Sequence, residues 1–413
     1  MAPLNSKQTA GPDMQTRFAH FTPFAFHSAA ATAVAAAVLV TALPAMAQPV
    51  PAPQVAARSW MLTDVTSGQV LGGANMDERI EPASLTKLMT AYLVFEAVRD
   101  GKLKYDQMIT PTETVRTVKT DESRMFLEAG KPASVREMTQ GLIIQSGNDA
   151  ALVLAEAVGG TETNFVMLMN REAERLGMKN THFANAAGLP DPNHYSTARD
   201  LSILTAALIK DFPQDYKFYS QKEFTYNNIK QSNRNRLLWL DPTVDGGKTG
   251  HTKSAGYCLV TSANRPLPDV PGANRRLLSV IIGTKSDAIR TQESLKVLNY
   301  GYQFFDTVRL YKAKEALQTP DVYKGQAKSV KLGVAEDKWI TVPKGAGARL
   351  KPVLERKDPL IAPIAQGQQL GTVKVMDGST VVSEFPVVAL EAVPEAGFIG
   401  RTIDAVKLWF KKK

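Results

Sequence analysis

The chain has a single cysteine, Cys258, among its 413 residues. One cysteine excludes an internal disulfide, so the hydrophobic core must stabilise the fold, and 44% apolar residues are ample for one. The neighbours of Cys258, residues 256–260, are typical of a strand. We therefore expect this thiol to be a buried small side chain, because a catalytic thiol needs an adjacent base.

The chain also lacks a long apolar run near its N-terminus. Residues 29–43 are rich in Ala and Val, but this run is only 15 residues long, and a membrane span needs about 20. Lys7 and Arg17 precede the run, and the small-residue pattern Ala45-Met46-Ala47 follows it. This pattern predicts a secretory signal peptide over residues 1–47, and the short run disfavours the alternative, an uncleaved membrane anchor.

The net charge of the chain is +9, and removing residues 1–47, which contain Lys7, Asp13 and Arg17, leaves +8. In an exported protein this balance favours lipid headgroups or cell wall as partners. No basic groove interleaved with aromatic residues is present, so nucleic acid is not expected as a partner. No metal-ligating cluster is apparent, and we expect neither a metal nor a cofactor.

A proline-rich extended leader is expected over residues 48–57, followed by an α+β domain over residues 58–310. Strands on both sides of a helical stretch predict one antiparallel sheet whose first and last strands pair. The expected strands cover residues 59–65, 69–71, 223–227, 257–262 and 277–282. One helix is expected to begin at Ser84, and further helices are expected over residues 138–144, 150–158, 164–176 and 292–305.

No helical periodicity occurs in residues 318–394. Residues 330–334 and 339–342 have strand character, and residues 373–382 form a hairpin pattern around Asp377-Gly378. We therefore expect a small β-sandwich domain over residues 311–394, in which we find no internal repeat and no catalytic cluster.

The final segment, residues 395–413, has the pattern of an amphipathic helix. It is too short to span a bilayer and suits an anionic membrane surface, with Leu408 as the one apolar residue out of place. The alternative is a helix that docks its apolar face on its own protein. The apolar side is formed by Phe398, Ile399, Ile403, Ala405, Val406, Trp409 and Phe410, and the charged side by Arg401, Asp404, Lys407, Lys411 and Lys412.

Ser84-Leu85-Thr86-Lys87 stands at the start of an apolar helix. Residues three apart share a helix face, so the Ser84 hydroxyl and the Lys87 amine are expected side by side. A serine becomes a nucleophile when a neighbour accepts its proton, and lysine can do so only if its pKa is lowered. The alternative is that Ser84 caps the helix and Lys87 lies in solvent.

Two more short motifs follow. Ser146-Gly147-Asn148 interrupts two predicted helices, and Lys248-Thr249-Gly250-His251-Thr252 is expected to open a strand that continues to Tyr257. On that strand Lys248 and Gly250 face one side, and Thr249 and His251 face the other. Gly250 lacks a side chain where something must lie flat against the backbone.

These motifs, in this order, resemble those of the penicillin-binding proteins and serine β-lactamases. The closer resemblance is to the low-molecular-mass D-Ala-D-Ala carboxypeptidases of the penicillin-binding protein 5 group, which share Ser-Gly-Asn, Lys-Thr-Gly-His-Thr and a following Ala255-Gly256-Tyr257. The resemblance implies a β-lactamase-like transpeptidase domain, a small β domain and a C-terminal amphipathic membrane helix.

The resemblance also implies roles for the motif residues. Ser84 would be the nucleophile that attacks the penultimate D-Ala carbonyl of a peptidoglycan pentapeptide, and Lys87 would be its general base. Ser146 with Lys248 would pass a proton to the departing D-Ala. Asn148 would hold the substrate amide or Lys87, and a nearby Lys248 would help to keep Lys87 neutral.

Substrate binding is implied in the same way. The segment Thr249, Gly250 and His251 would border the scissile bond, with the backbone N–H groups of Ser84 and His251 forming an oxyanion hole. Thr249 and an arginine would bind the terminal carboxylate, with Arg290 the first candidate and Arg234 the second. β-Lactam antibiotics would be covalent inhibitors, and the enzyme would lie on the periplasmic face of the inner membrane.

Three alternative functions compete with that of a carboxypeptidase. A class A β-lactamase should carry a Glu with Asn four residues on, and no Glu between Asn148 and Pro213 has this spacing, which predicts slow release of penicillin. A D,D-endopeptidase acting on cross-linked peptidoglycan uses the same acyl chemistry and stays open. A non-catalytic wall-binding protein is disfavoured because every motif residue is present.

Overall fold

The structure is a computed structural model that describes residues 51–411. The predicted signal peptide, residues 1–47, lies outside the described residues, as do Lys412 and Lys413 of the expected terminal helix. Among residues 51–411, none of the helices has the length and apolar character that crossing a membrane requires.

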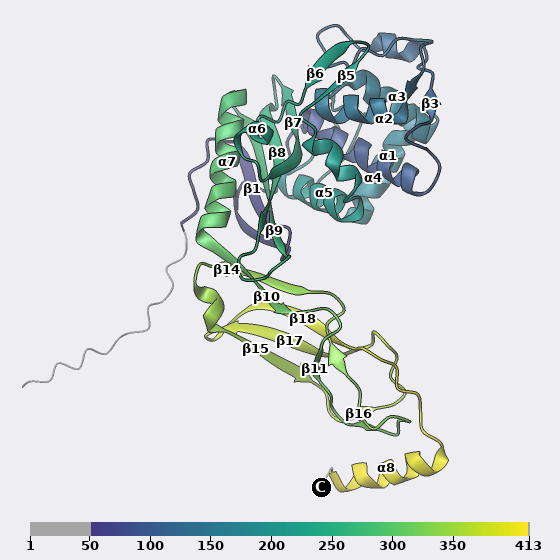
Figure 1. Cartoon of the computed structure of the whole chain (residues 1–413), viewed down its shortest axis with the longest axis vertical. Helices are drawn as coiled ribbons and strands as arrows, with labels where there is room; N and C mark the ends of the chain where they lie inside the picture. The colour runs from purple at the N-terminus through teal and green to yellow at the C-terminus, as the bar shows by residue number, and fades with distance from the viewer. Residues whose placement is uncertain (1–50, 412–413) are drawn as a thin grey trace, which may run out of the picture. The chain divides into compact units, whose positions relative to one another are not determined.

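A five-stranded antiparallel sheet forms the centre of the first domain (Figure 1). The pairing of the first strand with a late one was predicted and is confirmed, with Leu62 opposite Ser279. In spatial order the strands are β2 (Gln69–Ala74), β1 (Ser59–Asp64), β9 (Asn274–Thr284), β8 (Gly256–Pro266) and β7 (Val244–Thr252).

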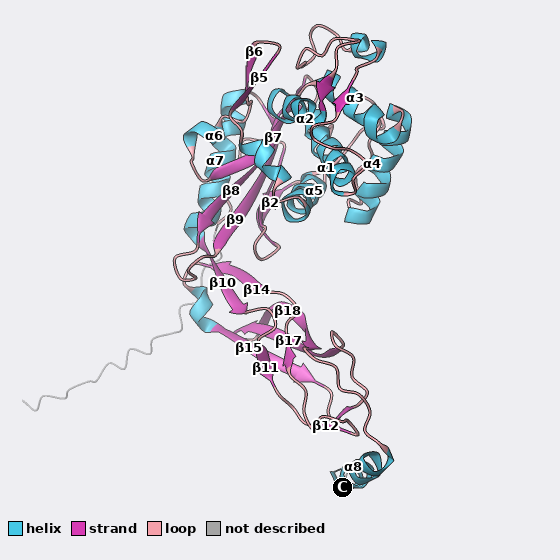
Figure 2. Ribbon diagram, turned by 45° about the vertical axis from the view of Figure 1, so that its right-hand side comes forward, coloured by secondary structure: helices cyan, strands magenta, loops and turns pink. Residues whose placement is uncertain are grey.

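Both faces of this sheet are covered by helices (Figure 2). Because successive strand residues point to opposite faces, Trp60 and Leu62 pack with Val297 of α7 (Asp287–Phe304), while Met61 joins the core beneath the other helices. The sheet is thus a rigid central layer, and its edge strand β7 carries the Lys-Thr-Gly motif.

The helical part begins with a 3₁₀ turn, η1 (Ala83–Thr86), and ends with a short helix, α6 (Leu237–Leu240). The predicted break at residues 146–148 is confirmed, since a π-helix, η3 (Gly141–Gln145), ends before it and α3 starts at Asn148. The intervening helices are α1 (Lys87–Arg99), α2 (Val135–Gln140), α3 (Asn148–Gly159), α4 (Glu162–Leu176) and α5 (Ala198–Asp211). A minor two-stranded sheet pairs β3 (Met108–Ile109) with β4 (Ala133–Ser134).

Two strand predictions need correction. The strand at residues 223–227 exists as β5 (Glu223–Tyr226), but it pairs with β6 (Ile229–Ser232) in a separate hairpin instead of joining the central sheet. Asn227 and Asn228 have φ of 48° and 59°, the tight turn that two-residue hairpin loops require. Lys248 and Tyr257 were predicted on one strand, but a turn between Thr252 and Gly256 places them on paired strands, β7 and β8.

The second domain is all-β, as predicted. Its hairpin at Gly378 is confirmed, and Val373, Val375 and Val387 lie in its separate core. Its main sheet has the order β11 (Ala316–Gln318), β13 (Leu332–Gly333), β18 (Thr380–Ala389), β17 (Gln369–Asp377) and β15 (Leu350–Arg356). Two smaller sheets pair β10 (Phe305–Tyr311) with β14 (Lys338–Pro343) and β12 (Val322–Tyr323) with β16 (Leu360–Ile361).

A buried carboxylate joins the central sheet to β10 and β14. Asp64, at the end of β1, accepts hydrogen bonds on Oδ2 from Arg275 Nε at 2.8 Å, Thr307 Oγ1 at 2.6 Å and Thr341 Oγ1 at 2.8 Å. The Asp64 side chain is fully buried, and that of Arg275 is 5% exposed. Removing one partner of such a pair leaves an uncompensated buried charge, so single substitutions in this cluster should destabilise the junction strongly.

The terminal helix α8 (Phe398–Lys411) contacts the β domain through its polar side. Asp404 accepts a hydrogen bond from the Lys324 backbone N–H at 2.7 Å, and Leu408, one turn later, is half-buried, which explains its place among charged residues. The apolar face is not docked on the protein, so that alternative is wrong for the described residues. Its large side chains are 52–78% exposed: Phe398, Ile399, Ile403, Val406, Trp409 and Phe410.

Candidate active site

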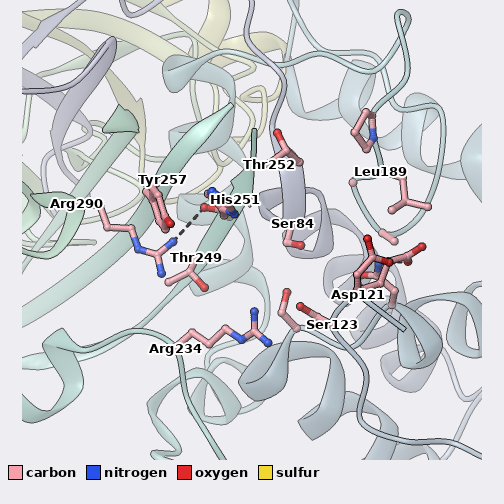
Figure 3. Close-up of a pocket in the computed structure, with 17 residues that line it drawn as sticks. Ser84, Asp121, Ser123, Leu189, Arg234, Thr249, His251, Thr252, Tyr257 and Arg290 are labelled. Atoms are coloured by element: carbon pink, nitrogen blue, oxygen red, sulfur yellow. Dashed lines mark hydrogen bonds between the residues drawn. The ribbon is translucent and has the colours of Figure 1, made fainter. Parts of the chain in front are cut away.

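The three motifs meet at a cavity of about 360 Å³ (Figure 3). Lys87 and Lys248 lie beneath its surface and are 1% and 2% exposed. All the other predicted site residues line the cavity, namely Ser84, Ser146, Asn148, Arg234, Thr249, Gly250, His251 and Arg290. The structure therefore brings together residues from a 3₁₀ turn, two loops, the edge strand β7 and the helices α3 and α7.

Ser84 lies in η1, the turn that leads into α1, and Lys87 is the first residue of α1. Lys87 Nζ donates a hydrogen bond to Ser84 Oγ at 3.1 Å. The alternative of a helix cap is wrong, because the cap positions are occupied by Pro82 and Thr86 and neither makes a side-chain cap hydrogen bond. Lys87 is also buried instead of solvated, so hydroxyl and amine lie side by side as the spacing predicted.

The Lys87 ammonium has two further acceptors, Asn148 Oδ1 and the Ala187 carbonyl oxygen, both at 2.7 Å. Burial lowers the pKa of Lys87 to about 7, and the positive charge of Arg234 contributes to this shift. The expected repulsion between the two lysines is present, because the charge of Lys87 lowers the pKa of Lys248. Arg234 is a further cation beside Lys87 that the sequence reasoning did not assign to this role. Near neutral pH a large fraction of Lys87 is therefore uncharged and able to accept a proton.

Lys248 on β7 donates to Ser146 Oγ at 2.8 Å and to the Thr249 carbonyl oxygen at 3.0 Å. Burial, followed by the positive charges of Lys87 and Arg234, lowers the pKa of Lys248 well below its usual range. Ser146 has φ 67° and ψ 34°, a left-handed conformation that is uncommon for residues other than glycine. This strained position at the end of η3 directs the hydroxyl toward Lys248, as is common for functional side chains.

Asn148 links Lys87 to a residue that the sequence reasoning missed. Its Nδ2 donates to Glu122 Oε2 at 2.5 Å, and Glu122 lines the cavity. The neighbouring Asp149 accepts the backbone N–H groups of residues 125–127, which fixes the loop that carries Glu122. No motif marks Glu122, and only the folded loop brings it to Asn148.

Two glycines allow backbones to approach the nucleophile. A Cβ atom at Gly250 would lie 3.1 Å from the Pro82 carbonyl oxygen and 3.2 Å from Leu85 Cγ, so the Ser84 turn lies flat against β7. Gly188 has φ +86°, and a Cβ atom there would lie 1.8 Å from the Ala83 carbonyl oxygen. The strand and the loop at residue 188 therefore clamp the Ser84 turn from two directions.

The two candidate arginines have different surroundings. Arg290 Nη1 donates to the carbonyl oxygens of Gly250 at 3.0 Å and Cys258 at 3.2 Å, and its Nη2 pairs with Asp287. Arg234 lines the cavity and makes no hydrogen bond or ion pair with any residue of the described range 51–411. Its guanidinium is therefore available to a ligand, while that of Arg290 is largely occupied by protein groups.

Charge is distributed unevenly around Ser84. Figure 3 shows Arg234, Arg290 and Thr249 on one side of Ser84 and Asp121 on the other. An anionic end group of a ligand would therefore be held on the arginine side.

Among the described residues, no group of three or more His, Cys, Asp or Glu is arranged to hold a metal ion.

His194 is a second residue that no sequence pattern singles out. Its Nδ1 accepts the Ala184 N–H at 3.0 Å, so Nε2 carries the proton of the neutral ring and donates it to Thr86 Oγ1 at 2.7 Å. Burial lowers the pKa of His194 to about 4, so the ring stays neutral at physiological pH. It ties the loop that bears Ala187 to the turn that bears Ser84.

Comparison with known families gives two matches. Residues 46–286 match the family described as D-alanyl-D-alanine carboxypeptidase. Residues 305–395 match the family described as the C-terminal domain of penicillin-binding protein 5. The two matches cover both folded domains.

Individual relatives and solved structures also resemble the chain over most of its length or over its first domain. The chain is 42% identical over 369 residues to D-alanyl-D-alanine carboxypeptidase DacC of Escherichia coli K12, covering 88% of this chain and 90% of that protein. The crystal structure of penicillin-binding protein 5 from Haemophilus influenzae is similar, with a TM-score of 0.79 and 41% identity over 84% of this chain and all of the other. Penicillin-binding protein D2 from Listeria monocytogenes, solved in its ampicillin-bound form, has a TM-score of 0.54 and 31% identity over 61% of this chain and all of that one.

Proposed function

This chain belongs to the D-alanyl-D-alanine carboxypeptidase family, and we propose that it removes the terminal D-Ala of peptidoglycan pentapeptides through an acyl-enzyme on Ser84. One observation carries the assignment of residues. The Lys87 amine lies 3.1 Å from the Ser84 hydroxyl, and its pKa is lowered to about 7. A buried amine with this pKa can act as a general base at neutral pH.

Acylation begins when neutral Lys87 accepts the proton of Ser84 Oγ. The oxygen attacks the carbonyl carbon of the penultimate D-Ala, and the backbone N–H groups of Ser84 and His251 stabilise the oxyanion. Each donor of an oxyanion hole contributes roughly 3 kcal/mol to transition-state stabilisation. The turn of Ser84 against Gly250 of β7 supports this arrangement, because it holds the two backbone segments in contact.

Breakdown of the tetrahedral intermediate needs a proton on the departing nitrogen. Ser146 Oγ, which accepts from Lys248 Nζ at 2.8 Å, passes its proton to the D-Ala amine and is reprotonated through Lys248. The C–N bond breaks and D-Ala leaves. Water then attacks the ester carbonyl and gives up a proton that returns to Lys248 through Ser146. Ser84 Oγ leaves with the proton that Lys87 accepted during acylation, so the enzyme is restored and the shortened peptide is released.

The terminal carboxylate of the substrate binds at the arginine side of the cavity, with Thr249. The sequence placed Arg290 ahead of Arg234 as its partner. The free guanidinium of Arg234 favours the opposite order, with Arg290 holding β7 and β8 in place through the Gly250 and Cys258 carbonyl oxygens. A guanidinium suits this task because it can bind a carboxylate with two parallel hydrogen bonds.

β-Lactam antibiotics acylate the same serine, with Ser84 Oγ opening the four-membered ring. The ampicillin-bound form of the Listeria monocytogenes relative supports this interpretation. Release of the penicilloyl group is slow, because no Glu between Asn148 and Pro213 has the spacing that positions a deacylating water in class A β-lactamases.

The enzyme acts outside the cytoplasm, on the periplasmic face of the inner membrane, with α8 lying in the membrane surface. The exposed apolar side chains of α8 and the cationic residues Lys407 and Lys411 support this placement. The pattern of a signal peptide over residues 1–47 supports export.

The test of this function compares two substrates. Free D-Ala should appear when the protein is incubated with a pentapeptide, and Ser84→Ala should abolish its release. A cross-linked dimer should be cut much more slowly. Faster cleavage of the dimer would favour the endopeptidase, and D-Ala release by Ser84→Ala at the native rate would contradict the assigned nucleophile.

A further inference from the structure

The structure assigns Glu122 as a positioning residue of the active site, whose carboxylate orients the Asn148 amide and places a negative charge beside the base Lys87. This inference rests on the proposed function, because it concerns the same proton transfer. Glu122 belongs to none of the three motifs and lies 26 residues before Asn148.

The hydrogen bonds form a short chain from the nucleophile to Glu122. Ser84 Oγ accepts from Lys87 Nζ at 3.1 Å, Lys87 Nζ donates to Asn148 Oδ1 at 2.7 Å, and Asn148 Nδ2 donates to Glu122 Oε2 at 2.5 Å. The other carboxylate oxygen of Glu122 accepts the Lys119 N–H at 3.4 Å. The loop itself is tied to α3 by the hydrogen bond from Asn148 N to the Ser123 carbonyl oxygen at 2.7 Å.

Glu122 decides which end of the Asn148 amide faces Lys87. A carboxylate only accepts hydrogen bonds, so the NH₂ end of the amide must turn to Glu122 and the oxygen must turn to Lys87. The reverse orientation would oppose the amide oxygen to a carboxylate and NH₂ to an ammonium, with no hydrogen bond at either end. Without Glu122, neither orientation of the amide is enforced from the cavity side.

The charge of Glu122 also acts on the protonation of Lys87. The charged and titratable groups around Lys87 are Arg234 from the loop before α6, Lys248 from β7, His194 from the loop after α4, Asp149 from α3, and Glu122. Burial and Arg234 lower the pKa of Lys87, whereas Asp149 and Glu122 raise it. Asp149 is buried and accepts four backbone N–H groups, whereas Glu122 accepts one long one, so Glu122 is the carboxylate of this set whose substitution disturbs the loop less.

A neighbouring carboxylate provides a matched control. Asp121 also lines the cavity, but it makes no hydrogen bond or ion pair in the described part of the chain and is not among the charges that shift the pKa of Lys87. Both substitutions Glu122→Gln and Asp121→Asn remove one negative charge from the same rim. Only the first removes it from the hydrogen-bond chain.

The experiment measures the rate constant of acylation by benzylpenicillin from pH 5 to pH 9. Lys87 must be neutral to accept a proton, and loss of the Glu122 charge lowers its pKa, so the acid limb of the Glu122→Gln profile should move to lower pH. An opposite charge a few ångströms away shifts a pKa by about 1 unit or more, and partial exposure reduces this, so we expect a shift of roughly 0.5 to 1 unit. Asp121→Asn should leave the midpoint within about 0.2 units of the native value, a margin well below that shift.

A second variant separates orientation from charge. The amide oxygen introduced by Glu122→Gln can still accept from Asn148 Nδ2, so the plateau rate of this variant should remain within about threefold of the native rate, whereas Glu122→Ala should lower it by roughly tenfold, the cost of about one hydrogen bond. An unshifted acid limb in Glu122→Gln, or an equal shift in Asp121→Asn, would overturn the inference. If the native protein is not acylated at all, the proposed function fails first, so the two failures are distinguishable.

Discussion

The two arginines of the cavity are predicted to have different roles, Arg234 in binding the substrate carboxylate and Arg290 in holding strands β7 and β8 together. Arg234 offers a guanidinium with no hydrogen-bonding partner in the described chain. Arg290 uses Nη1 to bind the Gly250 and Cys258 carbonyl oxygens and Nη2 to bind Asp287. We expect Arg234→Gln to weaken recognition of the terminal carboxylate. Arg290→Gln should instead loosen the pairing of β7 with β8 and lower the midpoint of thermal unfolding.

The size of the Arg234 effect follows from the kind of interaction. A hydrogen bond to a charged group contributes about 1.5–3 kcal/mol, so kcat/KM for a pentapeptide should fall by roughly 10- to 150-fold in Arg234→Gln. A peptide with an amidated C-terminus offers no carboxylate, and its slow turnover should change by less than about threefold, because it lacks the charged partner.

A second effect of the same substitution must be separated from the first. The positive charge of Arg234 lowers the pKa of Lys87, so Arg234→Gln raises that pKa and moves the acid limb of activity to higher pH. Measuring kcat/KM at pH 9, where Lys87 is mostly neutral in both proteins, leaves the loss of carboxylate binding alone.

Arg236→Gln is the control for Arg234. Arg236 lies two residues further on, its side chain is 71% exposed, and it pairs with Asp287 outside the cavity lining. Its substitution should leave kcat/KM nearly unchanged. The reasoning is refuted if Arg234→Gln still discriminates between the free and amidated peptides as well as the native protein does, while a stably folded Arg290→Gln loses that discrimination.

Two further predictions concern stability and membrane binding. Asp64→Asn should lower the free energy of unfolding, measured by urea titration, by about 3–5 kcal/mol, because it leaves the buried charge of Arg275 without its carboxylate. The control Asp77→Asn breaks an exposed pair with Arg199 and should cost at most about 1 kcal/mol. Equal losses in the two variants would contradict this. A chain that ends at Pro394 should lose binding to liposomes containing anionic lipid while it keeps acylation by benzylpenicillin, and retained binding would exclude α8 as the anchor.

The parts of the site that the sequence predicted share a local origin. Ser84 and Lys87 are three residues apart, so the geometry of one turn brings them together. The break at Ser146 and the strand position of Lys248 also follow from local patterns, and the order of the motifs made their meeting in one cavity predictable. The alternating strands at both ends of the first domain similarly predicted that β1 and β9 pair.

The parts that were missed depend on contacts between distant segments. Glu122 and His194 carry no local pattern, and they reach the site only because loops fold over α1 and α3. The effect of Arg234 on the pKa of Lys87 was missed for the same reason, since the placement of Arg234 depends on the loop before α6. The residues at 223–227 had the right strand pattern, but whether a strand joins a sheet depends on partners that periodicity does not reveal.

The central claim is that Ser84 forms the acyl-enzyme, and intact-mass measurement after incubation with benzylpenicillin tests it most directly. The native protein should gain the mass of one penicillin molecule and keep it for long after free antibiotic is removed. Ser84→Ala, which leaves the cavity and Lys87 in place, should gain none. A native protein without a lasting adduct, or an equal adduct on Ser84→Ala, would contradict the account.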